Sequence, residues 1–185
     1  MAKRRAVKSN RRQPEAITML VQDHQKVQKL FRQFQNADSA EQRASIAEKV
    51  CNDLTVHTRL EEQVFYPAVR QAIEQKDLLD EAEVEHDVAK DLIEKLKGMT
   101  VKNGEYAATF TVLSEYVGHH IEEEQNELFP KVRKADLDFQ ALGQEMQQRK
   151  KELQEELGIE PDTADQRPAA ARQSRRATSS RSAAR

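Results

Sequence analysis

Apolar side chains recur at steps of three and four residues in four successive segments of this chain. This spacing places side chains on one face of an α-helix, and the segments begin near residues 15, 39, 77 and 104. Each apolar stripe also carries one histidine, and these are His24, His57, His86 and His120. Four helices of this length joined by short loops favour an all-α, up-down-up-down four-helix bundle, in which side chains of facing helices meet in the interior.

Three further segments flank the predicted bundle of residues 14–133. Residues 1–13 and 161–185 lack apolar periodicity, so we expect both to be disordered tails. Residues 134–160 contain a fifth amphipathic helix, from about Asp136 to Leu157, with no candidate ligand. We expect this helix to pack as a lid on the bundle or as an arm that faces a partner. Pro67 is expected to kink or end the second helix of the bundle.

Composition and charge exclude several classes of protein. The single cysteine, Cys51, supports neither a disulfide framework nor a CxxC metal site. No apolar run approaches the roughly 18–20 residues that cross a bilayer, and the basic start does not resemble a secretory signal, so a cytoplasmic location is predicted. Residues 1–12 carry six basic groups and residues 162–185 carry six arginines against two aspartates. Because the whole chain has a net charge of −2, the predicted bundle is acidic and its tails are basic.

A short pattern of potential metal ligands occurs twice. His57 is followed by Glu61 after four residues and by a proline after ten, and His120 is followed by Glu124 and a proline at the same intervals. Four helical residues bring the histidine and the glutamate onto one face, about 6 Å apart along the axis. The two remaining histidines of the stripes lie 33 and 34 residues before these pairs. A single histidine on a helix face is more often a hydrogen-bonded core residue, but the repetition favours a metal site.

The types of residue in this pattern restrict the metal. Imidazole and carboxylate ligands together suit iron, manganese or zinc rather than copper(I) or an iron–sulfur cluster. Six ligands spread along about 6 Å are easily shared by two ions, and two octahedral ions would keep about two positions open for an exogenous ligand. His119, Glu62 and Glu123 stand beside the pattern: we expect His119 to lie at the surface or behind the ligands, and Glu62 and Glu123 to be solvated.

These residues resemble the hemerythrin-like, or HHE cation-binding, domains over roughly residues 14–133. The resemblance implies a four-helix bundle with two non-haem iron ions, in preference to manganese or zinc. It also implies that the four stripe histidines are terminal ligands and that Glu61 and Glu124 are bridges. Oxygen-carrying hemerythrins have a fifth histidine one turn from that of the third helix, where this chain has Ala82 or Lys90. Glu83 or Glu127 is a possible replacement, and reversible oxygen transport is not expected.

Three functions remain open at this point. The first is binding or sensing of oxygen, nitric oxide, peroxide or the cellular redox or iron state, without a catalytic residue being assigned. The second is an oxidoreductase that consumes peroxide or oxidises ferrous iron. Ferritin-like proteins are disfavoured because only Glu83 and His86 match their Glu-x-x-His motif, and iron–sulfur repair proteins because an N-terminal cysteine motif is missing. The third is binding of nucleic acid or another polyanion through the basic tails.

Overall fold

The computed structural model describes residues 15–159, and every regular element within that range is helical. In chain order the elements are α1 (Glu15–Gln35), α2 (Ala40–Leu60), the π-helix η1 (Glu61–Phe65), α3 (Tyr66–Ala72), α4 (Asp77–Lys97), α5 (Gly104–Glu123), the π-helix η2 (Glu124–Leu128), α6 (Phe129–Val132) and α7 (Phe139–Glu156). No helix in this part of the chain is long and apolar enough to span a bilayer. The predicted tails, residues 1–13 and 161–185, lie outside the described residues.

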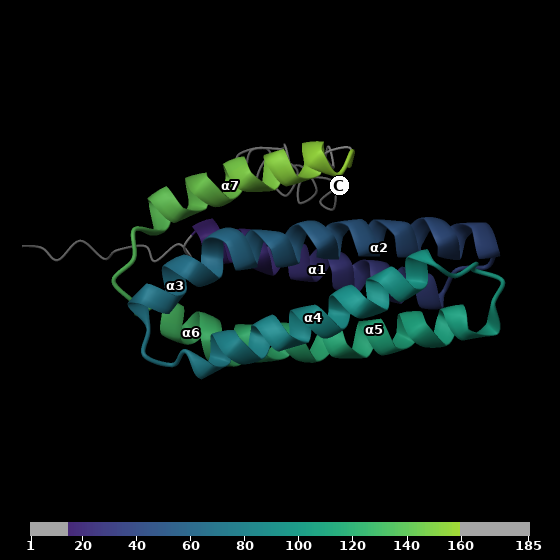
Figure 1. Ribbon diagram of the computed structural model, residues 1–185, viewed down its shortest axis with the longest axis horizontal. Helices are drawn as coiled ribbons and strands as arrows, with labels where there is room; N and C mark the ends of the chain where they lie inside the picture. The colour runs from purple at the N-terminus through teal and green to yellow at the C-terminus, as the bar shows by residue number, and fades with distance from the viewer. Residues whose placement is uncertain (1–14, 160–185) are drawn as a thin grey trace, which may run out of the picture.

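Helices α1, α2, α4 and α5 run side by side as an elongated bundle, with α3 and α6 at one end (Figure 1). Helix α1 packs on α2 and α4 packs on α5, so each half of the chain forms a helical hairpin. In both hairpins the second helix begins at a side-chain cap: Ser39 accepts a hydrogen bond from the Gln42 amide at 3.1 Å, and Asn103 accepts one from the Glu105 amide at 3.0 Å. The four-helix bundle predicted from the periodicity is confirmed.

A π-helical turn follows each pair of histidine and glutamate. The backbone amide of Tyr66 donates to the carbonyl of Glu61, five residues earlier, and the amide of Phe129 does the same with Glu124. A proline comes next in both halves, and the wider turn before it relieves the clash of its ring with the preceding turn. Pro67 does not end the second helix, because the helical path continues through η1 into α3, and α3 bends away from the line of α2 (Figure 1).

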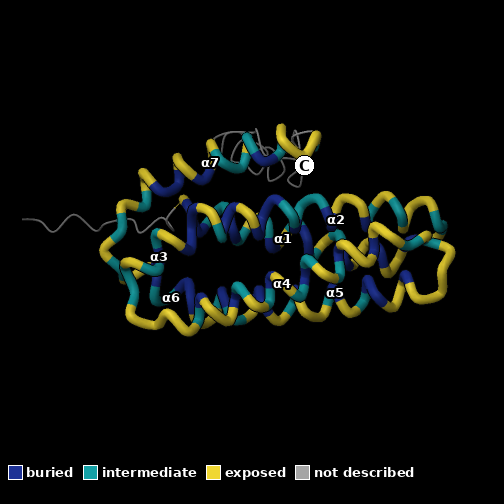
Figure 2. Tube along the Cα trace, viewed as in Figure 1, coloured by how far each residue is buried: buried dark blue, intermediate teal, exposed yellow. Residues whose placement is uncertain are grey.

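Two apolar clusters fill the bundle on either side of a polar middle layer. One cluster contains Phe65 and lies at the end formed by α3 and α6, and the other contains Phe110 and lies towards the opposite end. On α1, for example, His24 lies between Leu20 of the first cluster and Val27 of the second. Buried positions follow the inner faces of the bundle helices (Figure 2). The histidines therefore sit in a layer that apolar side chains close at both ends.

Helix α7 packs on the outside of the bundle against α1, α2 and η1. Leu142, Met146 and Leu153 are buried in this contact. Gly143 permits the close approach, since a Cβ at this position would stand 3.2 Å from the Cβ of Glu15. The fifth helix begins slightly later than the sequence indicates, after the Asp138 cap, and it covers the bundle as a lid.

Candidate metal centre

The six side chains predicted as metal ligands are buried together in the middle layer. The four histidines come from the four bundle helices, and each glutamate is the first residue of a π-helix. None of the six side chains is more than 7% exposed: His24, His57, Glu61, His86, His120 and Glu124. Polar groups buried this deeply need partners, because an unsatisfied polar group costs free energy away from water.

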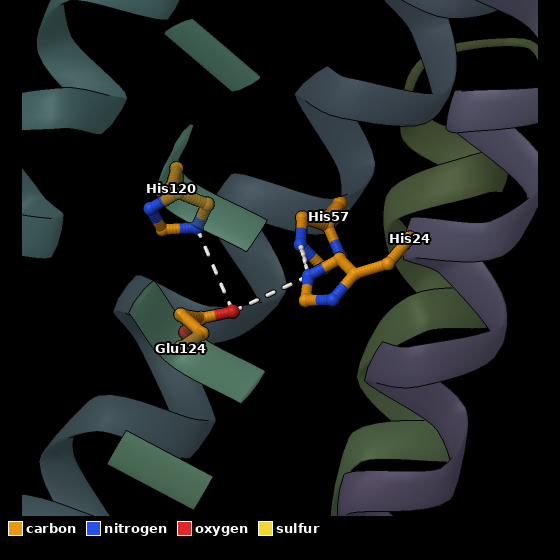
Figure 3. Close-up of side chains that lie close together, drawn as sticks. All are labelled: His24, His57, His120 and Glu124. Atoms are coloured by element: carbon orange, nitrogen blue, oxygen red, sulfur yellow. Dashed lines mark hydrogen bonds and ion pairs between the residues drawn. The ribbon is translucent and has the colours of Figure 1, made fainter. Parts of the chain in front are cut away.

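The histidines form two pairs through their Nε2 atoms. The Nε2 atoms of His24 and His57 lie 3.0 Å apart, and those of His86 and His120 lie 3.2 Å apart. The first pair joins α1 to α2 and the second joins α4 to α5, so each helical hairpin supplies one pair. Figure 3 shows the imidazoles of His24, His57 and His120 converging with the carboxylate of Glu124.

Each glutamate reaches across from one histidine pair to the other. Oε2 of Glu61 lies 3.1 Å from Nε2 of His57 and 3.4 Å from Nε2 of His86. Oε2 of Glu124 lies 3.2 Å from Nε2 of His24 and 3.6 Å from Nε2 of His120 (Figure 3). Each carboxylate therefore lies within 3.6 Å of one histidine from each pair.

The outer nitrogens of the second histidine pair face carboxylates. Nδ1 of His86 lies 2.9 Å from Oε1 of Glu62, and Nδ1 of His120 lies 2.9 Å from Oε2 of Glu85. A carboxylate at Nδ1 holds the proton there, so the lone pair of Nε2 points into the centre. The expectation that Glu62 is merely solvated is corrected: its carboxylate orients His86 and also pairs with Lys90 at 2.7 Å.

The outer nitrogens of the first pair have different neighbours. The carboxamide of Gln125 lies 3.2 Å from Nδ1 of His24, and half a turn of this group offers its oxygen as an acceptor. Oδ2 of Asp23 lies 3.8 Å from Nδ1 of His57, and Oδ1 of Asp23 accepts a hydrogen bond from Nζ of Lys150 at 2.6 Å. Helix α7 thus contributes a charged side chain to the wall of the centre.

Tyr66 belongs to the centre although the sequence did not single it out. Its buried hydroxyl donates a hydrogen bond to Oε1 of Glu124 at 3.0 Å and lies 3.4 Å from Nε2 of His86. The corresponding residue of the second half is Phe129, whose ring stacks on His24. The two halves therefore differ here, and the position beside His86 has an extra oxygen donor. In the sequence, the aromatic residue that precedes the proline in both repeats is the feature that could have indicated this position.

The two proposed replacements for the missing fifth histidine lie elsewhere. Glu83 is 46% exposed and accepts a hydrogen bond from Arg70 at 2.9 Å, and Glu127 is exposed. Arg70 draws the Glu83 carboxylate to the outside of the bundle, away from the histidines. The expectation that Glu83 or Glu127 replaces the fifth histidine as a ligand is therefore wrong.

Comparisons with known proteins identify the family and the fold. Residues 15–132 match the family model described as the hemerythrin HHE cation binding domain. The chain belongs to this family. A crystal structure of an HHE cation binding domain-containing protein from Mycobacterium kansasii superposes with a TM-score of 0.65 at 22% identity, over 75% of this chain and 86% of that one. A DNA nickase of Nostoc sp. is 30% identical over 111 residues, which are 60% of this chain but 31% of the nickase.

The electrostatics of the HHE centre follow from burial and mutual proximity. Burial, and then the charge of Glu124, raises the pKa of the Glu61 carboxyl well above its ordinary value. Burial also opposes ionisation of Glu124, but the neighbouring His120 and His24 outweigh it and lower the pKa of that carboxyl. Burial lowers the pKa of His57 to about 4, so its imidazole is neutral at pH 7. A neutral imidazole is the form that binds a metal ion.

The donors of the HHE centre fit a pair of cations. Both oxygens of Glu61 and Oε2 of Glu124 are buried without a hydrogen-bond partner among the described residues. Leaving such groups unsatisfied costs about 1–3 kcal/mol each, and more for a charged group. Metal ions between the histidine pairs would satisfy these oxygens and offset the repulsion of the two carboxylates. His24, His57, His120 and Glu124 lie within metal-ligating reach of one another, as do Glu61, His86 and His120.

A narrow cavity of about 30 Å³ opens onto all four histidines from the side of α7. Lys150 and Gln154 of α7 line it together with Lys26 of α1. A single water needs about 10–15 Å³, so the cavity has room for about two waters or one small molecule. The cavity therefore has room for a small molecule beside the four histidines, and α7 forms part of its wall.

Replacing Tyr66 by phenylalanine is expected to weaken the centre at the His86 side. The free energy of unfolding of the metal-free protein should fall by about 1–3 kcal/mol, because Oε1 of Glu124 loses its hydrogen-bond donor. The second of two metal equivalents should also bind more weakly. Urea denaturation and metal titration measure the two effects. Tyr116→Phe, at a half-exposed tyrosine, is the control, and equal effects of both substitutions would contradict this role for Tyr66.

Proposed function

We propose that this chain is a non-haem two-iron protein that binds or senses a small oxidising ligand, namely oxygen, nitric oxide or peroxide. The observation that carries the proposal is the position of Glu61 and Glu124, each of which contacts one histidine of both pairs. A single structural ion would need only one pair and one carboxylate. Shared carboxylates are the arrangement expected of ligands that hold two ions together.

Among the metals that suit this donor set, iron has the chemistry that the proposed function needs. Four imidazoles and two carboxylates suit iron, manganese and zinc. Of these, iron supplies reversible one-electron chemistry towards oxygen, nitric oxide and peroxide when it is bound. Membership of the HHE family supports a bound cation without distinguishing these metals. A cytoplasmic location, where reductants would return the centre to the ferrous state, remains part of the proposal.

The residues around the centre hold it in a dry and fixed geometry. The apolar clusters on either side exclude bulk water, and Glu62 and Glu85 keep the protons of His86 and His120 on their outer nitrogens. Tyr66 offers an oxygen beside the second pair, so the first pair, His24 and His57, has fewer protein donors. An external ligand would therefore bind beside His24 and His57, which line the cavity under α7 together with His86 and His120.

Metal content and an optical spectrum of aerobically purified protein test the proposal. We expect about two iron ions per chain and a near-ultraviolet ligand-to-metal band that changes on reduction. Air should then restore the oxidised spectrum, and vacuum should not reverse this step, because a ligand set without the fifth histidine is not expected to release oxygen unchanged. Stoichiometric zinc that ignores reductant would contradict iron, and a stable oxygen form released under vacuum would indicate oxygen transport.

An oxidoreductase that consumes peroxide or oxidises ferrous iron is the alternative use of the same centre. The cavity of about 30 Å³ accommodates peroxide as well as oxygen. Counting turnovers separates the two functions: a sensor consumes peroxide in amounts comparable with its iron, whereas an enzyme consumes many equivalents at a constant rate. Loss of the optical band during repeated additions would favour sensing.

DNA binding is a second candidate that the likeness to a DNA nickase supports. The basic tails, which lie outside the described residues, would supply the contacts to phosphate. Fluorescence anisotropy with a short DNA duplex at two salt concentrations tests this candidate. Neutralising Arg172, Arg175 and Arg176 to glutamine should weaken binding and flatten its salt dependence. Binding that is unchanged in this variant would exclude the C-terminal tail as the contact.

A further inference from the structure

A third pair of histidine and glutamate lies on the outer face of α5, one residue out of register with the buried pair. Nε2 of His119 lies 3.2 Å from Oε1 of Glu123, four residues later. Glu85 of α4 faces the same imidazole, with its Oε1 3.9 Å from Nε2 of His119. Donor atoms of Glu85, His119 and Glu123 all lie within 4.8 Å of one another. One imidazole and two carboxylates form a set that divalent iron, manganese or zinc prefers.

Glu85 connects this outer group with the buried centre. Its Oε2 lies 2.9 Å from Nδ1 of His120, while its Oε1 faces His119 on the outside. Exposure falls steadily along the path, from 64% at His119 through 32% at Glu123 and 15% at Glu85 to 2% at Glu124. The donors therefore form a series that leads from solvent to a bridging carboxylate of the centre.

A small cavity of about 10 Å³ lies between α4 and α5 at the inner part of this series, and His119 is not among its lining residues. Its walls include Glu81, Glu85 and Glu123 together with the inner residues His120 and Glu124. Oε2 of Glu124, in a side chain that is 98% buried, has no hydrogen-bond partner among the described residues. This oxygen faces His24 and His120, so the inner end of the acidic cavity meets the centre at a buried carboxylate that a cation would satisfy.

The charge of this passage differs from that of the cavity under α7. Four of its eight lining residues are glutamates, and none is lysine or arginine. The other cavity is lined by Lys26 and Lys150 together with Asp23, Asp53 and Glu85, and the two lysines pair with the two aspartates, so its lining is closer to neutral.

We propose that Glu85, His119 and Glu123 form an entry site that captures a divalent metal ion and passes it between α4 and α5 to the buried centre. The destination rests on the proposed two-metal function, but the entry site concerns the rate of loading and not the chemistry of the loaded centre. His119 and Glu123 bind the ion first, and Glu85 passes it inward. Small ligands and metal ions then reach the centre from different sides.

Loading of the metal-free protein with Co²⁺ tests the entry site. The d–d absorption of bound Co²⁺ reports the rate in a stopped-flow experiment, and the final intensity reports the amount bound. In the variant H119A/E123Q the rate is expected to fall at least about 10-fold, the lower end of the range by which charged clefts raise on-rates. The final amount and spectrum should match those of the unaltered chain, because both residues lie outside the buried ligand set.

Glu122→Gln is the matched control, since it removes one negative charge from an exposed position beside Glu123. Two results would overturn the entry site. In the first, H119A/E123Q loads Co²⁺ as fast as the unaltered chain. In the second, Glu122→Gln slows loading as much as H119A/E123Q does. If the double variant binds less Co²⁺ in total, the loading rate of H119A alone tests the entry site. This variant removes the imidazole and keeps the carboxylates. An unaltered chain that takes up no Co²⁺ at all would instead contradict the two-metal function itself.

Discussion

Replacing Glu61 or Glu124 by alanine is expected to reduce the metal content from about two ions per chain to one or none and to abolish the ligand-to-metal band. Each carboxylate contacts a histidine of both pairs, so its loss removes a donor from both metal positions at once. Loss of groups that only support metal ligands already costs about 10–100-fold in affinity, and loss of a bridge should cost more. Metal analysis after gel filtration and an optical spectrum measure the effect.

Two controls separate this effect from a general loss of charge or of fold. Glu127→Ala removes an exposed carboxylate one turn from Glu124, and His119→Ala removes an exposed imidazole beside His120. Both should leave the final metal content and the band nearly intact. Far-ultraviolet circular dichroism should show an unchanged helix content in Glu61→Ala, because neither oxygen of this carboxylate has a hydrogen-bond partner among the described residues. Two tightly bound ions in Glu61→Ala and Glu124→Ala would show that neither carboxylate is a bridge.

Removal of the metal is expected to lower the free energy of unfolding by about 3 kcal/mol when free metal had been present at about 100 times its dissociation constant. Bound ions stabilise the folded chain because the unfolded chain does not assemble the six ligands. Urea denaturation with and without a chelator measures the difference. A midpoint that does not respond to the chelator would contradict coupling between metal binding and folding.

Acid should reduce this stabilisation, since protons compete with metal for the same atoms. The pKa of Glu61 is raised in the metal-free chain, first by burial and then by Glu124, and the pKa of His120 is raised by Glu124 and Glu85 against the opposing effect of burial. Both groups hold protons that the metal must displace as the pH falls. We expect the metal affinity to fall about tenfold per pH unit for each proton displaced, between pH 7 and pH 5. Metal titrations at several pH values with a competing chelator measure this slope.

The metal-free chain should respond to pH much less steeply. The pKa of His57 is lowered to about 4 by burial, so its contribution to stability is present above pH 6.5 and is lost as the pH falls towards 4. Glu61 and His120 have raised pKa values, so their contributions are present at low pH and are lost as the pH rises. The pKa values of Glu124 and Asp23 are lowered, so their contributions are lost in acid together with that of His57, and Glu61 and His120 offset only part of this loss. A metal-free chain that loses as much stability on acidification as the loaded chain would show that protons act on the fold and not on the metal.

The sequence by itself determined the bundle and the positions of its six principal donors. Helical periodicity is a local property, so steps of three and four residues place His57 and Glu61 on one face whatever the helix packs against. The repeat of this pair as His120 and Glu124, with His24 and His86 at matched distances upstream, shows that both halves contribute alike. The helices follow these stripes closely, and the histidines meet at one level as the pattern indicates.

Only the tertiary structure decided which other side chains join the centre. In a regular α-helix the residue five positions after Glu61 would point about 140° away from it, so Tyr66 would turn from the site. The hydrogen bond from residue 66 to residue 61 in η1 widens this turn and brings the tyrosine round to Glu124. Likewise, Arg70 on a different helix draws Glu83 outward. The spacing of residues along the chain predicts which face of a regular helix each side chain occupies. π-Helical turns and contacts between helices depend instead on how the helices pack in the bundle.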